Sequence, residues 1–336
     1  MPFHQHGTFP RTRLRRPRQA DWSRRLHAET KLSTDDLIWP LILRDGNNVR
    51  EAVPSLPGVE RLSIDNAVDY ARQARDANAP ALAIFPYTGP EDRSANGDLA
   101  LDPDNLMCRA ARAIKEAVPD IGLIADVALD PYTDHGHDGI LTETDRGFEI
   151  DNDASVEVLV QQAVIQAKAG YDVVAPSDMM DGRVAAVRDG LERENLVSTQ
   201  IVSYAAKYAS GLYGPYRDAI GASGVLKGDK KTYQMNPANT DEAIREIALD
   251  ISEGADGIMV KPAGFYLDII RRAKSELKAP TYAFQVSGEC AMIEAGAQNG
   301  WIDRETVMTE SLLAIKRAGA DAIISYFAPA VSKLIR

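Results

Sequence analysis

The sequence predicts an α/β protein that forms a closed (β/α)8 TIM barrel preceded by an extended N-terminal arm. Short apolar runs alternate with longer stretches of helical periodicity along most of the 336 residues. Eight such runs occur, and eight parallel strands are the number that closes a barrel. An open, doubly wound sheet is the alternative, but no G-x-G-x-x-G turn follows the first run and no Walker-type loop occurs in the sequence.

Each predicted strand is a short, mostly apolar run, as expected of parallel strands that are covered on both faces. The first run, LIWPLIL at residues 37–43, is apolar throughout. The eight predicted strands are residues 37–43, 81–87, 121–129, 171–176, 199–204, 257–261, 280–286 and 322–326.

Helical stretches separate these strands. Ser63 is placed to cap the first helix, and Thr240 precedes a stretch that carries Ile244, Ile247 and Ile251 on one face. The predicted helices are residues 63–77, 103–118, 155–169, 181–194, 240–253, 264–276, 289–297 and 303–318. We therefore expect an arm at residues 1–35 and a catalytic barrel at residues 36–336, with a lid at about 211–239.

The composition is typical of an acidic, soluble, cytoplasmic protein. Lys plus Arg is 38 and Asp plus Glu is 49, so the net charge is -11, which disfavours nucleic acid and anionic membranes as partners. No apolar run approaches the roughly 18 residues that span a bilayer, and the first residues lack the apolar core of a signal peptide. The two cysteines, Cys108 and Cys290, exclude a disulfide framework and a cysteine-rich zinc site.

The N-terminal arm has the opposite charge. Residues 1–31 contain eight basic and two acidic side chains, or about +6, which leaves about -17 for the rest. The arm could be a solvated tail, bind nucleic acid, or pack on the acidic body of a neighbouring subunit. Leu14, Trp22 and Leu26 favour the last interpretation, because a free tail needs no apolar anchors.

Chemistry in such a barrel is carried by residues at the carboxyl ends of its strands. Two lysines, Lys207 and Lys261, stand at the ends of adjacent predicted strands. A lysine there either pairs with a carboxylate or is kept neutral, and a neutral amine can attack a carbonyl group. The other polar residues near strand ends are Asp126, Asp130, Asp138, Ser177, Asp178, Ser287 and Tyr326.

The stretch 130–139, DPYTDHGHDG, contains two histidines, His135 and His137, among three acids. This spacing could hold a divalent metal, but no partner ligand is obvious on later strands. The alternative is a polar turn whose acids orient the lysines.

The polar segment 211–239 is too long for an ordinary connection in a barrel, and it carries cations and aromatic residues. It is either a solvated loop or a lid, and cations in a lid suggest an anionic substrate such as a carboxylate.

Several motifs together closely resemble the porphobilinogen synthase (5-aminolevulinate dehydratase) family. They cover essentially the whole chain, from TRLRR in the arm to the last helix, and include DVALDPYTDHGHDG, APSDMMDGRV, VSYAAKYASGLYGPYRDA, TYQMNPANTDEA, GIMVKPAGFYLDIIRRAK and YAFQVSGE. The resemblance implies a (β/α)8 barrel whose arm wraps a neighbouring subunit in a homo-octamer. It also implies that two molecules of 5-aminolevulinate condense, with loss of two waters, to porphobilinogen in tetrapyrrole (haem) biosynthesis.

The resemblance further implies roles for individual residues. Lys261 and Lys207 would each form a Schiff base with one substrate. Arg217 and Lys230 would hold one substrate carboxylate, with Gln234 in the lid, and Ser287 and Tyr326 would hold the other; Lys231 competes with Lys230 for its role. The candidates for proton transfer and for binding the substrate amino group are Asp126, Asp130, Asp138 and Ser177.

The resemblance is incomplete at the metal site. Zinc-dependent members carry three cysteines where this sequence has Ala128, Asp130 and Asp138, so no catalytic zinc is expected. The chain resembles the cysteine-free branch, in which a glutamate matching Glu246 helps to bind an allosteric Mg²⁺. Glu246 could instead be an ordinary exposed acid, and some cysteine-free relatives need no metal.

Two other functional classes remain open at this point. A class I aldolase also uses a Schiff base, but it needs one lysine rather than two. A nucleic-acid-binding or scaffold protein would use the basic arm and would assign no role to Lys261.

Overall fold

The computed structural model describes residues 7–145 and 147–335. The chain divides into two compact units, Met1–Lys31 and Leu32–Arg336, so the boundary lies slightly before the one expected at residue 35.

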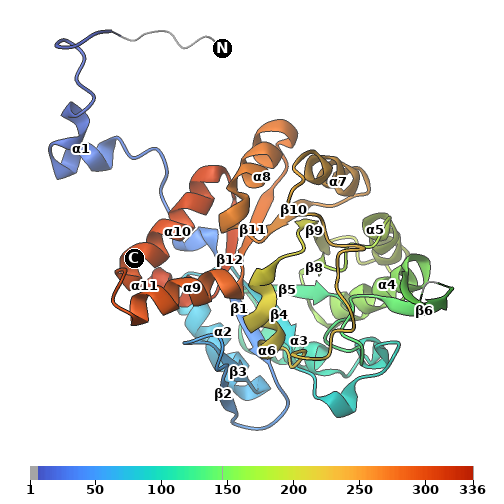
Figure 1. Ribbon diagram of the computed structural model, residues 1–336. Coiled ribbons are helices and arrows are strands. Elements are labelled where there is room, and N and C mark those ends of the chain that lie inside the picture. Colours follow the sequence, from blue (N-terminus) through green and yellow to red (C-terminus); the bar gives the residue numbers. More distant parts are fainter. Residues whose placement is uncertain (1–6, 146, 336) are drawn as a thin grey trace. The chain divides into compact units, whose positions relative to one another are not determined.

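Within the described residues, eight parallel strands close into a barrel, as the sequence predicts (Figure 1). The closing pair is β12 with β1, in which Leu37 lies opposite Ile323. The strands, in their order around the barrel, are β1 (Leu37–Leu43), β4 (Ala81–Pro86), β5 (Gly122–Val127), β8 (Val173–Pro176), β9 (Gln200–Lys207), β10 (Gly257–Lys261), β11 (Thr281–Gln285) and β12 (Ala322–Ser325).

Helices surround this ring of strands (Figure 1), because each has an apolar face that packs on the strands and a polar face toward solvent. They are α2 (Ile64–Asp76), α3 (Leu106–Ala117), α4 (Asn152–Ala169), α5 (Arg183–Arg193), α7 (Asp241–Ser252), α8 (Leu267–Arg272), α9 (Ser287–Gln298), α10 (Arg304–Ala318) and α11 (Ala328–Leu334).

Two details of the predicted helices are wrong. Ser63 stands at the N-cap position of α2, but its hydroxyl bonds the Asp65 carboxylate at 2.5 Å instead of capping the helix. The predicted helix 264–276 is divided into a 3-10 turn, α8 and a π-helical turn at Ala273–Leu277.

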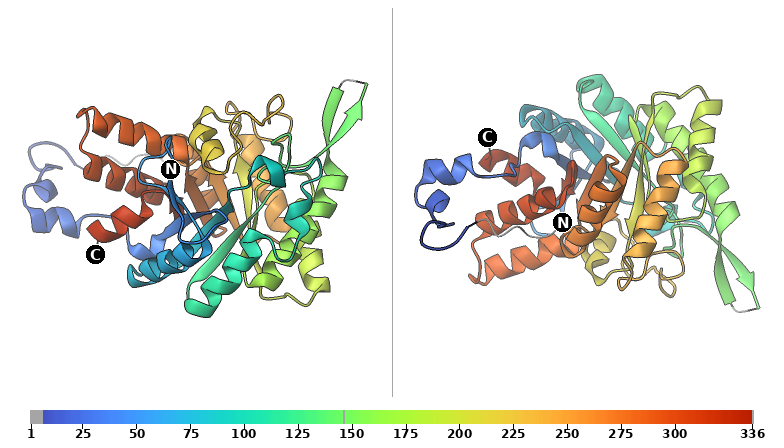
Figure 2. Two further views of the ribbon diagram at one scale, coloured as in Figure 1. Left: turned by 90° about the horizontal axis from the view of Figure 1, so that it is seen from below. Right: turned by 90° about the horizontal axis from the view of Figure 1, so that it is seen from above.

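Two strand pairs were not predicted. A hairpin of β6 (Ile140–Thr144) and β7 (Gly147–Asp151) projects from the barrel in both views of Figure 2. A second pair, β2 (Arg50–Ala52) and β3 (Glu60–Leu62), extends the sheet beside β1. Both pairs are short and, apart from the buried Arg61 and Leu62 of β3, partly or fully exposed, so they lack the apolar run by which a buried strand is recognised.

The pairing of β9 with β10 contains a bulge. Ile258 pairs with Ser203, whereas Val260 pairs with Ala206, so β9 has one more residue than β10 over this interval. Side chains normally alternate between the two faces of a strand, and an extra residue reverses the alternation beyond it. Tyr204 and Lys207, which are three residues apart, can therefore face the same site.

The lid segment, residues 211–239, includes a short helix, α6 (Gly214–Ala219), which crosses in front of the barrel in Figure 1. The segment is tied to the strand ends by backbone hydrogen bonds, since Met235 N donates to Lys207 O and Ala209 N donates to Met235 O.

The arm unit contains one short helix, α1 (Asp21–Leu26), in which Arg24 and Arg25 pair with Asp21. Its apolar side chains Leu14, Trp22 and Leu26 are 77%, 65% and 74% exposed. No helix in the described ranges has both the length and the apolar composition needed to cross a membrane.

Candidate active site

Lys207 and Lys261 occupy the last positions of β9 and β10 and are paired directly across the two strands. Neighbouring strands lie about 4.8 Å apart, so the two amines enter one pocket. Both side chains are buried. The sequence predicted both lysines at the mouth of the barrel, and the structure brings them together.

The Lys261 ammonium group is surrounded by aromatic rings. Its Nζ lies 4.8–5.3 Å from the ring centres of four residues, and it forms no hydrogen bond or ion pair with the described residues. Burial, reinforced by the nearby charge of Lys207, lowers the pKa of Lys261 from 10.5 to about 7. Cation–π attraction favours the charged form by about 0.5–2 kcal/mol, but the loss of hydration outweighs it.

The rings around Lys261 come from Tyr204 on β9, Tyr213 and Tyr216 in the lid segment, and Phe284 on β11. Burial raises the pKa of all three tyrosines well above the usual value, so their hydroxyls stay neutral and bring no negative charge to the amine. Sequence analysis missed this cage. The signal for it in the sequence was the tyrosine-rich stretch around Lys207, SYAAKYASGLYGPY.

Lys207 has polar partners, in contrast to Lys261. Its Nζ donates to the Asp138 carboxylate at 3.0 Å and to the backbone oxygen of Ser177. The other oxygen of Asp138 accepts a hydrogen bond from Lys230 Nζ at 2.5 Å. Although burial alone would raise the pKa of Asp138, the two ammonium groups hold it well below the usual range, and the carboxylate stays ionised.

Lys230, a predicted ligand for a substrate carboxylate, is bound between two protein carboxylates here. Its Nζ contacts Asp130 at 3.0 Å as well as Asp138. Despite burial, these two charges raise the pKa of Lys230. Asp130 and Asp138 are thus neutralised by an ammonium group.

Asp126 is a candidate for proton transfer. Burial raises its pKa to about 6, against the opposing charges of Lys261 and Lys207. Its Oδ2 accepts a long hydrogen bond of 3.5 Å from the Tyr216 hydroxyl, and its Oδ1 has no partner among the described residues. A carboxyl group in this environment can both accept and donate a proton near neutral pH.

A cavity with a volume of about 20 Å³, room for roughly one water molecule, is lined by both lysines and by the lid segment, and neither Asp126 nor Asp138 lines it. The lid segment forms much of its wall, so the site as described is closed. The predicted site residues that line it are Lys207, Lys261, Asp130, Ser177, Arg217, Lys230 and Gln234. Arg217 is a half-buried cation with no ion pair among the described residues, and it is free to meet an anion.

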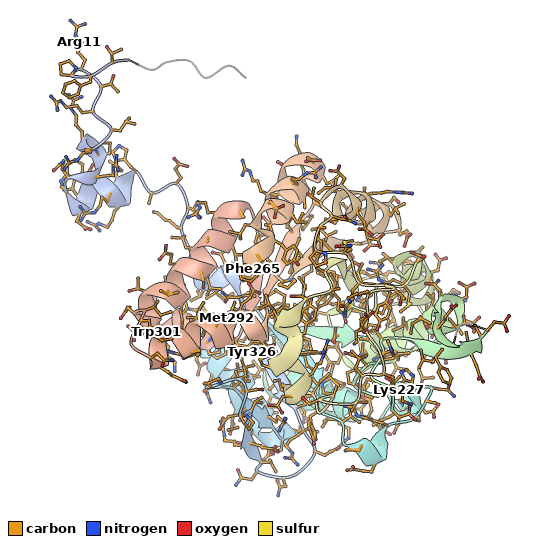
Figure 3. All side chains as sticks on the ribbon, in the orientation of Figure 1. Arg11, Lys227, Phe265, Met292, Trp301 and Tyr326 are labelled. Carbon is orange, nitrogen blue, oxygen red and sulfur yellow. The ribbon has the colours of Figure 1, made fainter. Side chains whose placement is uncertain are left out.

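Ser287 and Tyr326, the predicted pair for the second carboxylate, do not line this cavity. The Ser287 hydroxyl accepts a hydrogen bond from Tyr216 N at 2.9 Å, which ties it to the lid segment. The hydroxyl of Tyr326, which is labelled in Figure 3, is buried without a partner among the described residues. The ring of Tyr326 packs against Phe284.

Glu246 lies apart from both lysines. It lines a cavity of about 750 Å³ that contains neither lysine, and its side chain is 23% exposed. Its Oε1 is 3.4 Å from Arg183 Nη1, and Asp181 lines the same cavity. One or two carboxylates beside an open, water-accessible space fit a hydrated Mg²⁺, which keeps most of its waters.

Other metal arrangements find less support. No group of three or more His, Cys, Asp or Glu is arranged to hold a metal within residues 7–145 and 147–335. Both ring nitrogens of His135 and of His137 are engaged in hydrogen bonds, which disfavours the metal interpretation of that turn.

Comparisons with known proteins agree in assigning one family. The family model for delta-aminolevulinic acid dehydratase matches residues 11–334. The chain is 58% identical to the delta-aminolevulinic acid dehydratase of Bradyrhizobium diazoefficiens, over 96% of this chain and 91% of that protein. It is 50% identical to the protein of that name from Rhodobacter capsulatus, over 97% of each.

One solved structure is closely similar. It is the delta-aminolevulinic acid dehydratase (porphobilinogen synthase) of Toxoplasma gondii in complex with the reaction product porphobilinogen, with 43% identity and a TM-score of 0.93. The alignment covers 96% of this chain and 91% of the other.

The pKa of Lys261 can be tested by carbamylation with cyanate, a small reagent that reacts with neutral amines. The reaction of Lys261 should rise with pH through about 7 and then level off, because the neutral fraction is complete above its pKa. Exposed Lys231 serves as the reference site in the same protein. Peptide mass spectrometry measures both sites in one sample.

The Lys207→Met variant gives the electrostatic control. Removal of the neighbouring charge should move the inflection of Lys261 to higher pH. If Lys261 reacts in parallel with Lys231 in the unmodified protein, the proposed neutral amine is wrong.

Proposed function

Because the chain belongs to the delta-aminolevulinic acid dehydratase family, we propose that Lys261 and Lys207 carry the reaction as two neighbouring Schiff-base nucleophiles. The protein is a lyase of porphyrin biosynthesis that condenses and dehydrates two molecules of 5-aminolevulinate to porphobilinogen. The observation that carries the proposal is the pairing of two buried lysines at adjacent strand ends, one of them with a pKa near 7.

Lys261 is the first nucleophile in this proposal. Its amine is substantially neutral at pH 7, so it can attack the substrate ketone without a separate proton acceptor. Loss of water gives a Schiff base, whose protonated form withdraws electrons and acidifies the adjacent carbon. The aromatic cage stabilises such a cation by its π faces while excluding water.

Lys207 must lose a proton before it can attack. Its Nζ donates hydrogen bonds to Asp138 and to the backbone oxygen of Ser177. Asp126 interacts electrostatically with both lysines and has a pKa of about 6, so we assign it as the proton acceptor. Two lysines holding two substrates convert a bimolecular condensation into an effectively unimolecular step.

The substrate carboxylates are assigned to two groups of residues. Arg217, an unpaired cation on the cavity wall, is suited to bind one of them in a bidentate manner, together with Lys230 and with Gln234 nearby. Lys230 would have to exchange at least one of its carboxylate partners for the substrate. The unpartnered hydroxyl of Tyr326 supports the assignment of Ser287 and Tyr326 to the other carboxylate.

Substrate binding requires the lid segment to open. The described cavity holds about one water molecule, whereas two substrates must enter. Opening moves Tyr216 and Arg217 away from the lysines, and closure restores the dry surroundings on which the low pKa of Lys261 depends.

We assign an allosteric Mg²⁺ to Glu246, and no catalytic zinc to the lysine pocket. When bound, the ion would supply positive charge beside Glu246 and Asp181. Arg183 gives a physical connection from there toward the active site, because it contacts Glu246 at 3.4 Å and Asp178, the neighbour of Ser177, at 3.7 Å.

A homo-oligomer, most simply an octamer, is proposed from the arm. Its exposed Trp22 and Leu26 need cover, and its positive charge complements the acidic body. A cytoplasmic location suits the two cysteines, which are both free and buried.

Loss of either lysine tests the covalent mechanism. Lys261→Ala should lower turnover by roughly 10⁴-fold or more, since it removes the first nucleophile, and Lys207→Ala should impair it severely with the fold intact. Borohydride trapping with 5-aminolevulinate, followed by peptide mapping, should label both lysines in the unmodified enzyme. Lys231→Ala, beside Lys230 but exposed, is the matched control; substantial product from Lys261→Ala would end the hypothesis.

The metal assignment is tested on helix α7. Glu246→Ala should abolish stimulation by Mg²⁺ but retain the activity seen without it, because an allosteric ion acts on the equilibrium between states. Glu242→Ala, which alters another carboxylate on the same cavity, should keep the stimulation. Steady-state assays with and without Mg²⁺ decide this, and an enzyme that loses activity with its zinc and regains it with zinc alone would refute the assignment.

Deletion of residues 1–31 tests the role of the arm. The truncated protein should form a smaller assembly with lower activity, although no catalytic candidate is removed. Burial of each apolar anchor is worth roughly 1.5–3 kcal/mol, more than an exposed ion pair. Sedimentation velocity measures the change, and an unchanged assembly with full activity would return the arm to the solvated-tail interpretation.

A further inference from the structure

The HGH turn, residues 135–137, has no part in the reaction proposed above, but it packs against the lid segment. Lys227, labelled in Figure 3, lies in that segment, and its backbone N donates to His135 O at 3.1 Å. Gly136 has a φ of +73°, and a Cβ there would come within 3.1 Å of the Leu226 backbone. The turn and the lid segment therefore approach more closely than any residue other than glycine would allow.

His137 joins the two segments through its side chain. Its ring is buried, with Nε2 at 2.7 Å from Lys227 O and Nδ1 at 3.0 Å from the Tyr233 hydroxyl. A carbonyl oxygen can only accept, so Nε2 carries a proton. Both partners of the ring belong to the lid segment.

The hydroxyl of Tyr233 extends this series of hydrogen bonds to the carboxylate of Asp138. This hydroxyl lies 3.1 Å from Asp138 Oδ2 and accepts a hydrogen bond from Asp138 N at 3.4 Å. The hydroxyl of Tyr233 donates its proton either to Asp138 or to His137. In the first case His137 carries protons on both ring nitrogens, and in the second case its Nδ1 is unprotonated and accepts. In both arrangements His137 and Tyr233 are bonded to each other.

This series of hydrogen bonds ends at Lys207 and Lys230. Asp138 contacts both Lys207 and Lys230, and Lys230 lies between Lys227 and Tyr233 in the sequence. Backbone hydrogen bonds from Tyr233 N and Gln234 N to Lys230 O close a turn around that lysine. Hydrogen bonds of His137 to Lys227 O and to Tyr233, and of Tyr233 to Asp138, thus hold the stretch that presents Lys230 to the pocket.

We propose that His137 and Tyr233 are positioning residues that latch the lid segment over the active site and place Lys230 at the Asp138 end of the pocket. The latch acts on substrate retention, because Lys230 and Arg217 lie on the segment it secures. This role adds to the proposed function and depends on it, because substrate retention presupposes that the site binds 5-aminolevulinate. The latch itself is a property of the protein without substrate.

Hydrogen exchange on the substrate-free protein tests the latch directly. In His137→Phe and in Tyr233→Phe, amides of residues 226–236 should exchange about tenfold faster, since a lost buried hydrogen bond favours local opening. Amides of β10 should be unaffected. The effects of the two substitutions should be less than additive in the double variant, because both remove the His137–Tyr233 bond and each keeps one bond that the other loses.

Kinetics provide the second measurement. The KM for 5-aminolevulinate should rise about tenfold in both variants, with a smaller change in kcat and with borohydride trapping of both lysines retained. Tyr282→Phe on β11 is the control, because its hydroxyl forms no hydrogen bond with the described residues and its loss should change neither quantity.

Two outcomes would overturn the proposal. Unchanged exchange of residues 226–236 in both variants would show that no latch exists, whatever the activity. A fall in kcat alone, with normal KM and exchange, would instead place His137 in the chemistry. If trapping failed in the unmodified enzyme while exchange behaved as expected, the covalent mechanism would fail and the latch would stand.

Discussion

The site depends on burying three lysine amines and three carboxyl groups so close together that not all of them keep their usual charge. Lys207, Lys230 and Lys261 share one pocket, and Asp138 forms ion pairs with the first two. Lys261 is left among aromatic rings, where repulsion and desolvation make its neutral form accessible. The pKa of Asp126 shifts in the opposite direction, because burial raises it to about 6. An amine and a carboxyl group whose pKa values both lie near neutrality thus interact electrostatically within one buried site.

This balance ties the conformation of the lid segment to the chemistry of the amine. Tyr213 and Tyr216 supply two of the four rings around Lys261, and both belong to that segment. With the segment closed, the amine loses hydration and becomes reactive. With it open, water would stabilise the ammonium form. The nucleophile is therefore strongest when solvent is excluded, which suits a reaction that must eliminate water.

Much of the fold was predictable because buried parallel strands are apolar runs that end in polar residues. The eight strands, the two lysines and the cluster of Asp126, Asp130 and Asp138 followed from that pattern. Contacts formed by the lid segment did not, because a polar segment with little periodicity does not reveal its path. The pairing of Lys230 with two carboxylates and the tyrosine cage depend on that path. The pattern placed Ser287 and Tyr326 at strand ends, but their roles rested on family resemblance, and the closed cavity does not include them.

The bulge in β9 has a consequence for insertions and deletions. Loss of one residue between Tyr204 and Lys207 would leave both lysines, both strands and every motif recognisable. Residues two apart in a regular strand point to the same side, so the alternation restored by that loss would still leave Tyr204 and Lys207 facing one site. The bulge therefore marks a place where β9 can lose a residue without separating two groups that must meet.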